Sequence, residues 1–320
     1  MPLAKGSPLI RYIINRIIFY IPTLLVILFL VFLMIRSVPG DPIRVMYGEH
    51  EPPPEVRKVL EERLGLDKPI YAQFLLYLKR ILVDGDWGKS VSTGEPVLQM
   101  ILTRFRATLE LTVVSIAIAA TIGIGLALLS VYKLNSIIDK CVRIVSIASY
   151  SLPVFWWGLI LILIFAVNLG ILPPGGRGTP MHLVLPSITL AIANFGMFAR
   201  VSRASMLDVL VQDFVVVGKA KGLSDKALLI FYILRNASIP IATVVGLRFG
   251  VLMGGAVITE TVFNYPGVGK MIYDAILSRD YPVIFGGVLF IAIVVMTVNL
   301  AVDLAYYSLD PRVRLEKKVE

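Results

Sequence analysis

Long uncharged runs of apolar residues alternate with short polar segments along this chain of 320 residues. Four runs hold no charge, over residues 17–35, 144–176, 178–199 and 281–302. Two more are each interrupted once, 107–132 by Glu110 and 236–259 by Arg248. About 20 apolar residues cross the hydrocarbon core of a bilayer. The pattern therefore predicts an all-α integral membrane protein with six transmembrane helices, near residues 12–35, 107–132, 142–169, 183–206, 237–259 and 284–307.

Prolines and glycines set the expected ends of these helices. The first helix should stop at "VPGDP", and Pro153 should kink the third. The run 144–176 is too short for two spans and counts once. Basic residues precede the first run as in a signal peptide, but "RSVPGDP" follows instead of a small-x-small cleavage site. We expect a retained anchor.

One substantial polar region, residues 36–106, carries 11 basic and 10 acidic residues. Its "PPPEVRKVLEERLGL" predicts a proline-led helix closed by Gly65, and "YAQFLLYLKRILVDGDWG" predicts an amphipathic helix ending near Asp84 and Gly85. We expect a small helical extracytoplasmic subdomain. The predicted organisation is residues 1–36 (cytosolic N-terminus and first span), 37–106 (subdomain), 107–307 (transmembrane core, with a cytosolic loop at 207–236) and 308–320 (cytosolic tail).

Basic residues in the short loops predict the orientation. With the N-terminus inside, the inner segments hold 16 of them: Lys5, Arg11, Arg16, Lys133, Lys140, Arg143, Arg200, Arg203, Lys219, Lys221, Lys226, Arg235, Arg312, Arg314, Lys317 and Lys318. The short outer loops hold three, Arg177, Lys270 and Arg279. We expect both termini in the cytosol of a multi-pass protein of the cytoplasmic or inner membrane.

The composition agrees with a bilayer environment, because 57% of the residues are hydrophobic and 17% are charged. Topology accounts for the net charge of +9, so no nucleic-acid partner is expected. The single cysteine, Cys141, excludes an internal disulfide and is expected to pack. With His50 and His182 it forms no metal-ligand cluster, and no nucleophile, base and acid come together, so we expect neither a metal site nor a catalytic residue.

The segment "DFVVVGKAKGLSDKALLIFYILRNASIP", residues 213–240, is basic and amphipathic between two apolar segments. Val215, Val216 and Ala220 can share one helical face. Gly222 offers a helix stop, and Ser224 or Asp225 an N-cap for the next helix. From the residues alone, this helix, glycine elbow and helix fit either an interfacial element that holds lipid headgroups or a rigid hinge presented to a cytosolic partner.

The fifth predicted span carries a stripe of small residues at four-residue spacing, which lets another helix approach closely: Ala242, Gly246, Gly250 and Gly254. The stripe fits ordinary close packing with no further role. Arg248 points roughly 200° away from Gly246 at mid-depth. A charge there is costly, so Arg248 either faces a translocation path or a partner membrane subunit, or forms a structural ion pair.

Other polar residues are interpreted as structural. Glu260, Asp274 and Asp303 are expected to be helix-end or packing groups rather than substrate ligands, and Glu110 is expected to pair with Arg106. "PGVGK" is similar to a phosphate-binding loop, but Asn264 and Met271 stand where that loop needs a glycine and a hydroxyl. This chain is not expected to bind ATP there.

Residues 213–236 resemble the coupling loop of binding-protein-dependent ABC importer permeases. That family's pattern is Glu-Ala-Ala, three residues, Gly, then Leu-Pro twelve and thirteen positions later. Gly222 and Leu234 match it. Val216, Val217 and Gly218 replace Glu-Ala-Ala, and Arg235 replaces the proline, so a contact made by that glutamate must be made differently here. "DFVVVGKAKGLS" is similar to the dipeptide/oligopeptide branch, "D-Y-V-R-T-A-R-A-K-G-L-S".

The resemblance to that branch extends over nearly the whole chain, through "IPTLLVILFLVFLMIRSVPGDP", "YLKRILVDGDWGKSV", "SLPVFWWGLILILIFAVNLGILPPGGR", "ETVFNYPGVGKMIYDAILSRDYPV" and "VNLAVDLAYYSLDPRVR". It implies the type I ABC importer permease fold and a lipid-embedded subunit that imports di- or oligopeptides. It also implies a second homologous permease, two ATPase subunits that hold ATP and magnesium, and an extracytoplasmic binding protein. The coupling residues implied are Val217, Gly218, Ala220, Lys221, Gly222, Leu223 and Ser224.

Other functions stay open at this point. The branch includes carriers of oligosaccharides and nickel. An ion- or proton-coupled secondary transporter should show midplane acidic residues and internal symmetry, and the sequence shows neither. A structural or lipid-associated membrane protein is the third alternative, and co-purification with an ATPase distinguishes the importer from both.

Overall fold

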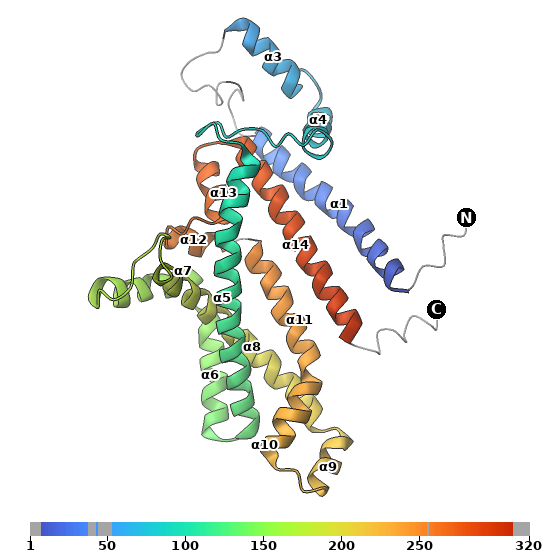
Figure 1. Ribbon diagram of the computed structural model, residues 1–320, viewed down its shortest axis with the longest axis vertical. Coiled ribbons are helices and arrows are strands. Elements are labelled where there is room, and N and C mark those ends of the chain that lie inside the picture. Colours follow the sequence, from blue (N-terminus) through green and yellow to red (C-terminus); the bar gives the residue numbers. More distant parts are fainter. Residues whose placement is uncertain (1–7, 38–42, 44–52, 255, 310–320) are drawn as a thin grey trace. The chain divides into compact units, whose positions relative to one another are not determined.

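The computed structural model describes residues 8–37, 43, 53–254 and 256–309, and these residues are mainly helical (Figure 1). The helices are α1 (Pro8–Ser37), α3 (Pro54–Leu64), α4 (Ile70–Leu82), α5 (Val97–Tyr132), α6 (Ile137–Ser151), α7 (Val154–Leu161), η1 (Ile162–Asn168), α8 (Met181–Leu210), α9 (Asp213–Ala220), α10 (Asp225–Ala227), η2 (Leu228–Ile233), α11 (Leu234–Met253), α12 (Val257–Val262), α13 (Val268–Leu277) and α14 (Tyr281–Leu309). In the described part, extended backbone pairs once, at Lys89 and Pro96. The all-α class is as predicted.

Five helices are long and apolar enough to cross a membrane, over residues 13–37, 97–132, 181–210, 225–253 and 281–305. A sixth candidate is the pair 137–151 and 154–168, bent by 97° at its break. Counted as one broken span, this pair brings the described candidates to the six that the sequence predicts. The "VPGDP" stop after α1 and most of the C-terminal tail lie outside the described residues.

Pro153 does more than kink the third span. Leu152 (φ −99°, ψ 143°) and Pro153 (φ −58°, ψ 141°) are both extended, so α6 ends completely before α7 begins. A proline lacks the N–H that continues a helix and disfavours helical geometry in the preceding residue. The Trp157 indole N–H donates to the Ser149 carbonyl, 3.1 Å away, which satisfies one backbone group near the break.

Two predicted helix boundaries were wrong. α5 begins at Val97, ten residues before the predicted start, and runs through Arg104 and Arg106. α11 ends at Met253, and a separate short helix, α12, follows it. Hydropathy reports which residues suit lipid, whereas a helix needs only continuous backbone hydrogen bonds, so α5 extends beyond its apolar run.

The described residues pack as two compact units, those within 1–106 and 267–294 and those within 107–266 and 295–320. In the first, α1 and α4 share a core with the start of α14: Leu28, Phe32, Phe74, Leu78, Ile81, Phe285 and Leu289. Gly65 (φ +64°) ends α3 and Gly85 (φ +66°) follows α4, so both predicted turns of the polar region are confirmed.

The second unit depends on close helix contacts at small residues. An ideal Cβ at Gly196 of α8 would lie 2.1 Å from the Ser146 carbonyl oxygen of α6, so only glycine allows this approach. Gly123 of α5 meets α8 in the same way, 2.7 Å from the Phe195 carbonyl oxygen. Since lipid is as apolar as the helices, such packing, rather than hydrophobic burial, holds spans together.

Candidate functional site

Residues 213–236, which we call the elbow, form a short helix that turns back on the start of a long one. α9 ends at Ala220, and Ser224 caps the next helix by accepting a hydrogen bond from the Ala227 N–H, 3.4 Å away. That helix runs without a break through α10 and η2 into α11. The sequence predicts two helices under the membrane, whereas the second is the beginning of the fifth span.

Gly222 makes the turn possible. Its φ of +79° is a left-handed conformation that favours glycine, and no atom lies within 4 Å of its ideal Cβ position. The Gly222 N–H donates to the Lys219 carbonyl at 2.9 Å, and the Leu223 N–H donates to the Gly218 carbonyl at 3.2 Å. These two bonds form a Schellman cap. Backbone conformation, rather than crowding, is the reason for glycine at position 222.

The inner face of α9 is fixed to the membrane-spanning core. Val215 is buried in a cluster with Ala127, Val131, Met206, Val209, Leu228, Leu229, Ile233, Ala237 and Ile241. Gly218 is also buried, and an ideal Cβ there would lie 2.9 Å from Leu228 Cδ1. Glycine at this position, where the family pattern has alanine, lets α9 lie against η2.

The outer face of α9 exposes apolar and basic side chains side by side. Val216 and Val217 are 65% and 51% exposed, and Lys219, Ala220 and Lys221 are exposed as well. Of the three residues expected to share a helical face, Val215 is buried, whereas Val216 and Ala220 are exposed. Packing follows the three-residue spacing of Val215 and Gly218 instead, because Gly218 is the point of closest approach to η2.

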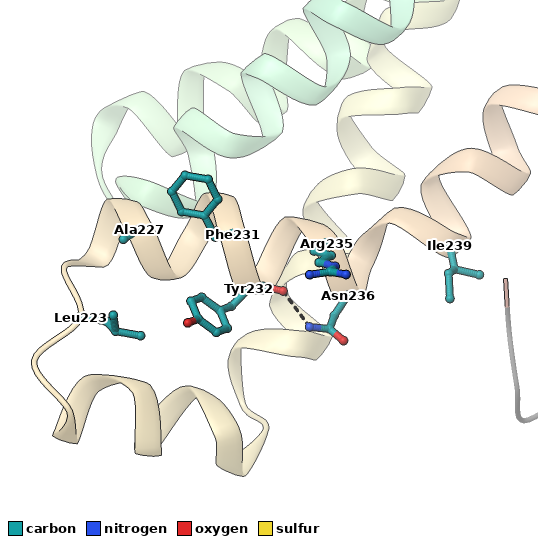
Figure 2. Close-up of a pocket in the computed structure, with 7 residues that line it drawn as sticks. All are labelled: Leu223, Ala227, Phe231, Tyr232, Arg235, Asn236 and Ile239. Carbon is teal, nitrogen blue, oxygen red and sulfur yellow. Dashed lines mark hydrogen bonds between the residues drawn. The ribbon is translucent and has the colours of Figure 1, made fainter.

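A groove of about 670 Å³ lies along the elbow (Figure 2), lined by Leu223, Ala227, Phe231, Tyr232, Arg235, Asn236 and Ile239. Figure 2 shows Leu223 and Tyr232 pointing into the space between α9 and the following helix. The Asn236 side-chain amide donates to the Tyr232 carbonyl at 2.8 Å. Phe231 is 67% exposed, so the rim of the groove combines an aromatic ring with the cation of Arg235.

A buried ion pair that the sequence reasoning missed joins the helices leading to the elbow. Asp139, at the start of α6, is fully buried, and Arg203 of α8 donates from Nε to Oδ1 (2.9 Å) and from Nη2 to Oδ2 (3.1 Å). The Ser130 hydroxyl of α5 donates to the same carboxylate at 2.5 Å. The sequence gives one signal of this pair: Asp139 stands three residues after Ser136, the N-cap of α6. That spacing does not indicate which helix supplies the cation.

The small-residue stripe of α11 lies against the end of α14. Ideal Cβ atoms would lie 2.5 Å from Val302 Cγ2 at Gly246, 3.0 Å from Asn299 Oδ1 at Gly250 and 3.2 Å from Val295 Cγ2 at Gly254. Ala242, at the start of the stripe, is exposed.

Arg248 is half-buried, and its Nη2 and Nε contact the Met197 sulfur of α8 at 2.6 and 3.0 Å. Among the ion pairs of the described residues, none involves Arg248. The structural ion pair that the sequence left open is therefore not seen in this part of the chain.

The expectations for Glu110 and Cys141 need correction. Glu110 pairs with Arg177 (2.7 Å), not with Arg106, because the fold brings the loop before α8 to the start of the membrane core. Burial raises the pKa of the nearby Tyr265 hydroxyl, so this side chain stays neutral. The side chain of Cys141, which was expected to pack in the interior, is exposed.

The remaining acidic candidates have structural partners. Glu260 is fully buried and accepts a hydrogen bond from Thr108, and Asp274 pairs with Lys270. No group of three metal-ligating side chains occurs in the described residues, which include His182 but not His50.

Two family models match the chain. Residues 119–315 match the "binding-protein-dependent transport system inner membrane component", and residues 9–112 match the N-terminal model of such membrane components. A solved structure of an amino acid ABC transporter has a TM-score of 0.50 at 18% identity, over 66% of this chain and 94% of that one. That likeness concerns the fold.

Similar proteins of known name align over nearly their full length. A di/tripeptide transport system permease of Pseudomonas aeruginosa is 40% identical, over 97% of this chain and 100% of its own. The dipeptide permease of Escherichia coli K12 is 36% identical over the same shares, and its glutathione permease is 38% identical over 96% and 99%.

Removing the cation of the buried pair should destabilise the protein strongly. Arg203→Met leaves the Asp139 charge buried without its main partner, which costs about 3–5 kcal/mol. Arg143→Ala is the matched control, since Arg143 is half exposed and 3.7 Å from the same carboxylate, and a solvent-exposed pair contributes about 0–1 kcal/mol. Thermal unfolding of both variants in detergent measures the difference; equal unfolding temperatures would contradict this assignment.

Proposed function

Because the chain belongs to the family of inner membrane components of binding-protein-dependent transport systems, and is a permease subunit of an ABC importer, we propose that it imports short peptides. The supporting observation is full-length similarity to permeases named for dipeptides, for di- and tripeptides and for glutathione, itself a modified tripeptide.

We infer the other subunits of the importer from the family. This chain would form half of the membrane path, paired with a second, homologous permease. Two ATPase subunits would hold ATP and magnesium on the cytosolic side, and an external binding protein would deliver the peptide. The chain itself would carry out no covalent chemistry and bind no cofactor. The excess of basic residues on one side supports cytosolic termini and a cytosolic elbow.

The elbow is the part proposed to receive force from the ATPase. Its exposed Val216 and Val217 supply apolar area, and Lys219 and Lys221 supply charge, to a groove on the partner. Because Val215 and Gly218 fix α9 to η2, a push on α9 passes directly into the fifth span. The Asp139–Arg203 pair ties α8, which enters the elbow, to α5 and α6.

Closure of the ATPases on ATP would then displace the elbow as a rigid body. α8 and α11 would move with it, and access would alternate between the two sides of the membrane. The free energy that drives this change is the difference between the affinities of the ATPases for the two conformations of the permease. A flexible elbow would transmit little of it to the spans.

Arg248 is proposed to line the translocation path. A guanidinium whose observed contact is a thioether sulfur, at mid-depth in a span, is costly in lipid but suits a polar passage. It would also complement the terminal carboxylate of a peptide.

The substrate proposal is tested with the partner binding protein, which makes most of the selection. A calorimetric screen should detect di- and tripeptides but neither oligosaccharides nor nickel. Uptake of the selected peptide by the reconstituted importer should require ATP inside. Binding of nickel or a sugar alone would overturn the peptide assignment while leaving the family unchanged.

Disrupting the elbow should separate ATP hydrolysis from uptake. Gly222→Pro removes the N–H that bonds to Lys219 and fixes φ near −65°, so α9 loses its position. We expect near-wild-type insertion and persisting ATP hydrolysis, with uptake reduced to a small fraction. Gly222→Asn is the matched control, since asparagine tolerates left-handed geometry, and it should keep most uptake. Wild-type import by the proline variant would show that the coupling site lies elsewhere.

Removing the charge of Arg248 should slow transport without changing assembly. Arg248→Ala is compared with Met197→Leu, which changes the arginine's contact partner but keeps the charge. At equal expression, we expect reduced uptake in the first variant and near-normal uptake in the second. Equal transport by Arg248→Ala and the wild type would remove Arg248 from the path.

A further inference from the structure

α4 has an apolar stripe that the core of the first unit does not cover. Tyr71, Leu75, Lys79 and Leu82, spaced four, four and three residues apart, fall on one side of the helix, and all four are exposed. Tyr71 is 63% exposed, Leu75 is 60% and Leu82 is 63%. A helix with such a face usually borders lipid or another protein.

The two other sides of α4 are occupied. Phe74, Leu78 and Ile81 pack into the core shared with α1 and α14, on a side roughly 100° from the stripe. Gln73 and Leu76 contact the turn after α3, where Gln73 donates to the Lys68 carbonyl at 2.9 Å. In Figure 1, α3 lies above α4 and α1 runs downward from it. The stripe is thus roughly 140° from the side that meets α3.

The depth at which α4 meets α1 identifies what covers the stripe. Phe74 packs edge-on against Phe29 and at a tilt against Phe32, with ring centroids 5.2 and 5.7 Å away. Both rings belong to the uncharged run 17–35, seven and four residues before Arg36. At 1.5 Å per residue they lie about 10 and 6 Å below the first charge. Helices that lie in the membrane surface reach about 5–10 Å into it.

The neighbouring surface of α1 is also apolar and open. Leu25 and Ile21 lie on the side of α1 that meets α4, one to two turns deeper than Phe29; they are 39% and 53% exposed, and they belong to a helix long enough to cross the membrane. The stripe on α4 therefore continues a surface that faces lipid. Tyr71 supplies the amphipathic ring typical of a membrane interface, and the stem of Lys79 can cover apolar area while its ammonium reaches the headgroups.

From this geometry we propose that α4 lies in the membrane surface at the C-terminal end of α1 and binds lipid through Tyr71, Leu75, Lys79 and Leu82. The helix fixes the polar region after α1 at the bilayer, with α3 on its aqueous side. The proposal depends on the membrane location of the chain but not on which substrate it imports.

Nitroxide labels test this contact in the complete importer, reconstituted in vesicles of phosphatidylethanolamine and phosphatidylglycerol. Cys141→Ser removes the native thiol, and Leu75→Cys and Leu82→Cys each receive one label. Asp84→Cys, exposed two residues beyond α4, is the matched aqueous control. We expect both stripe labels to collide several-fold more often with oxygen than with a water-soluble nickel complex, and the Asp84 label to show the reverse.

Two results would overturn the proposal. Stripe labels as open to the nickel complex as the Asp84 label would place α4 in water. Stripe labels protected from both reagents would mean that a protein partner covers the stripe. Measuring two stripe positions guards against one variant that assembles poorly, and ATP-driven uptake by each labelled importer reports assembly independently.

Discussion

The close approach of α9 to the beginning of the fifth span is the contact on which the elbow depends. Gly218 brings the two backbones together over Leu228, Val215 fills the cluster beneath, and Gly222 supplies the left-handed turn that makes the return possible. Without Gly218, α9 could not lie close to the span. Without Gly222, the chain could not turn back after α9. Together these three residues hold a surface helix against the beginning of a membrane helix.

The same principle holds deeper in the second unit. The hydrophobic effect does not drive helix association within lipid, so spans are held together where their backbones approach closely or where polar groups pair. Gly196 joins α8 to α6, and Gly246 joins α11 to α14. The buried Asp139–Arg203 pair adds a connection that fixes α8 against α5 and α6. Under the proposed mechanism, a movement of the elbow would pass into neighbouring helices through packing on one side and through an ion pair on the other.

Local chemistry made much of the fold predictable. Apolar run lengths reported the spans, and Gly65, Gly222 and Ser224 marked turns whose geometry their own residue type determines. Predictions of side-chain pairs that depend on tertiary contacts were wrong or missing. Nothing local shows that Asp139 meets a helix 64 residues away, or that Glu110 chooses Arg177 over Arg106. The helix breaks at Pro153 instead of kinking, because the preceding residue, Leu152, is extended as well.

The central claim, that α9 and the start of the fifth span move as one rigid body, is tested by joining them. Gly218→Cys and Leu228→Cys are combined with Cys141→Ser, the smaller side chain at 228 making room for the larger one at 218. ATP-driven uptake by the reconstituted importer is measured with the disulfide formed and again after reduction. The rigid elbow predicts equal uptake in both states. Loss of uptake on oxidation, restored by reduction, would mean that α9 must separate from the span during transport.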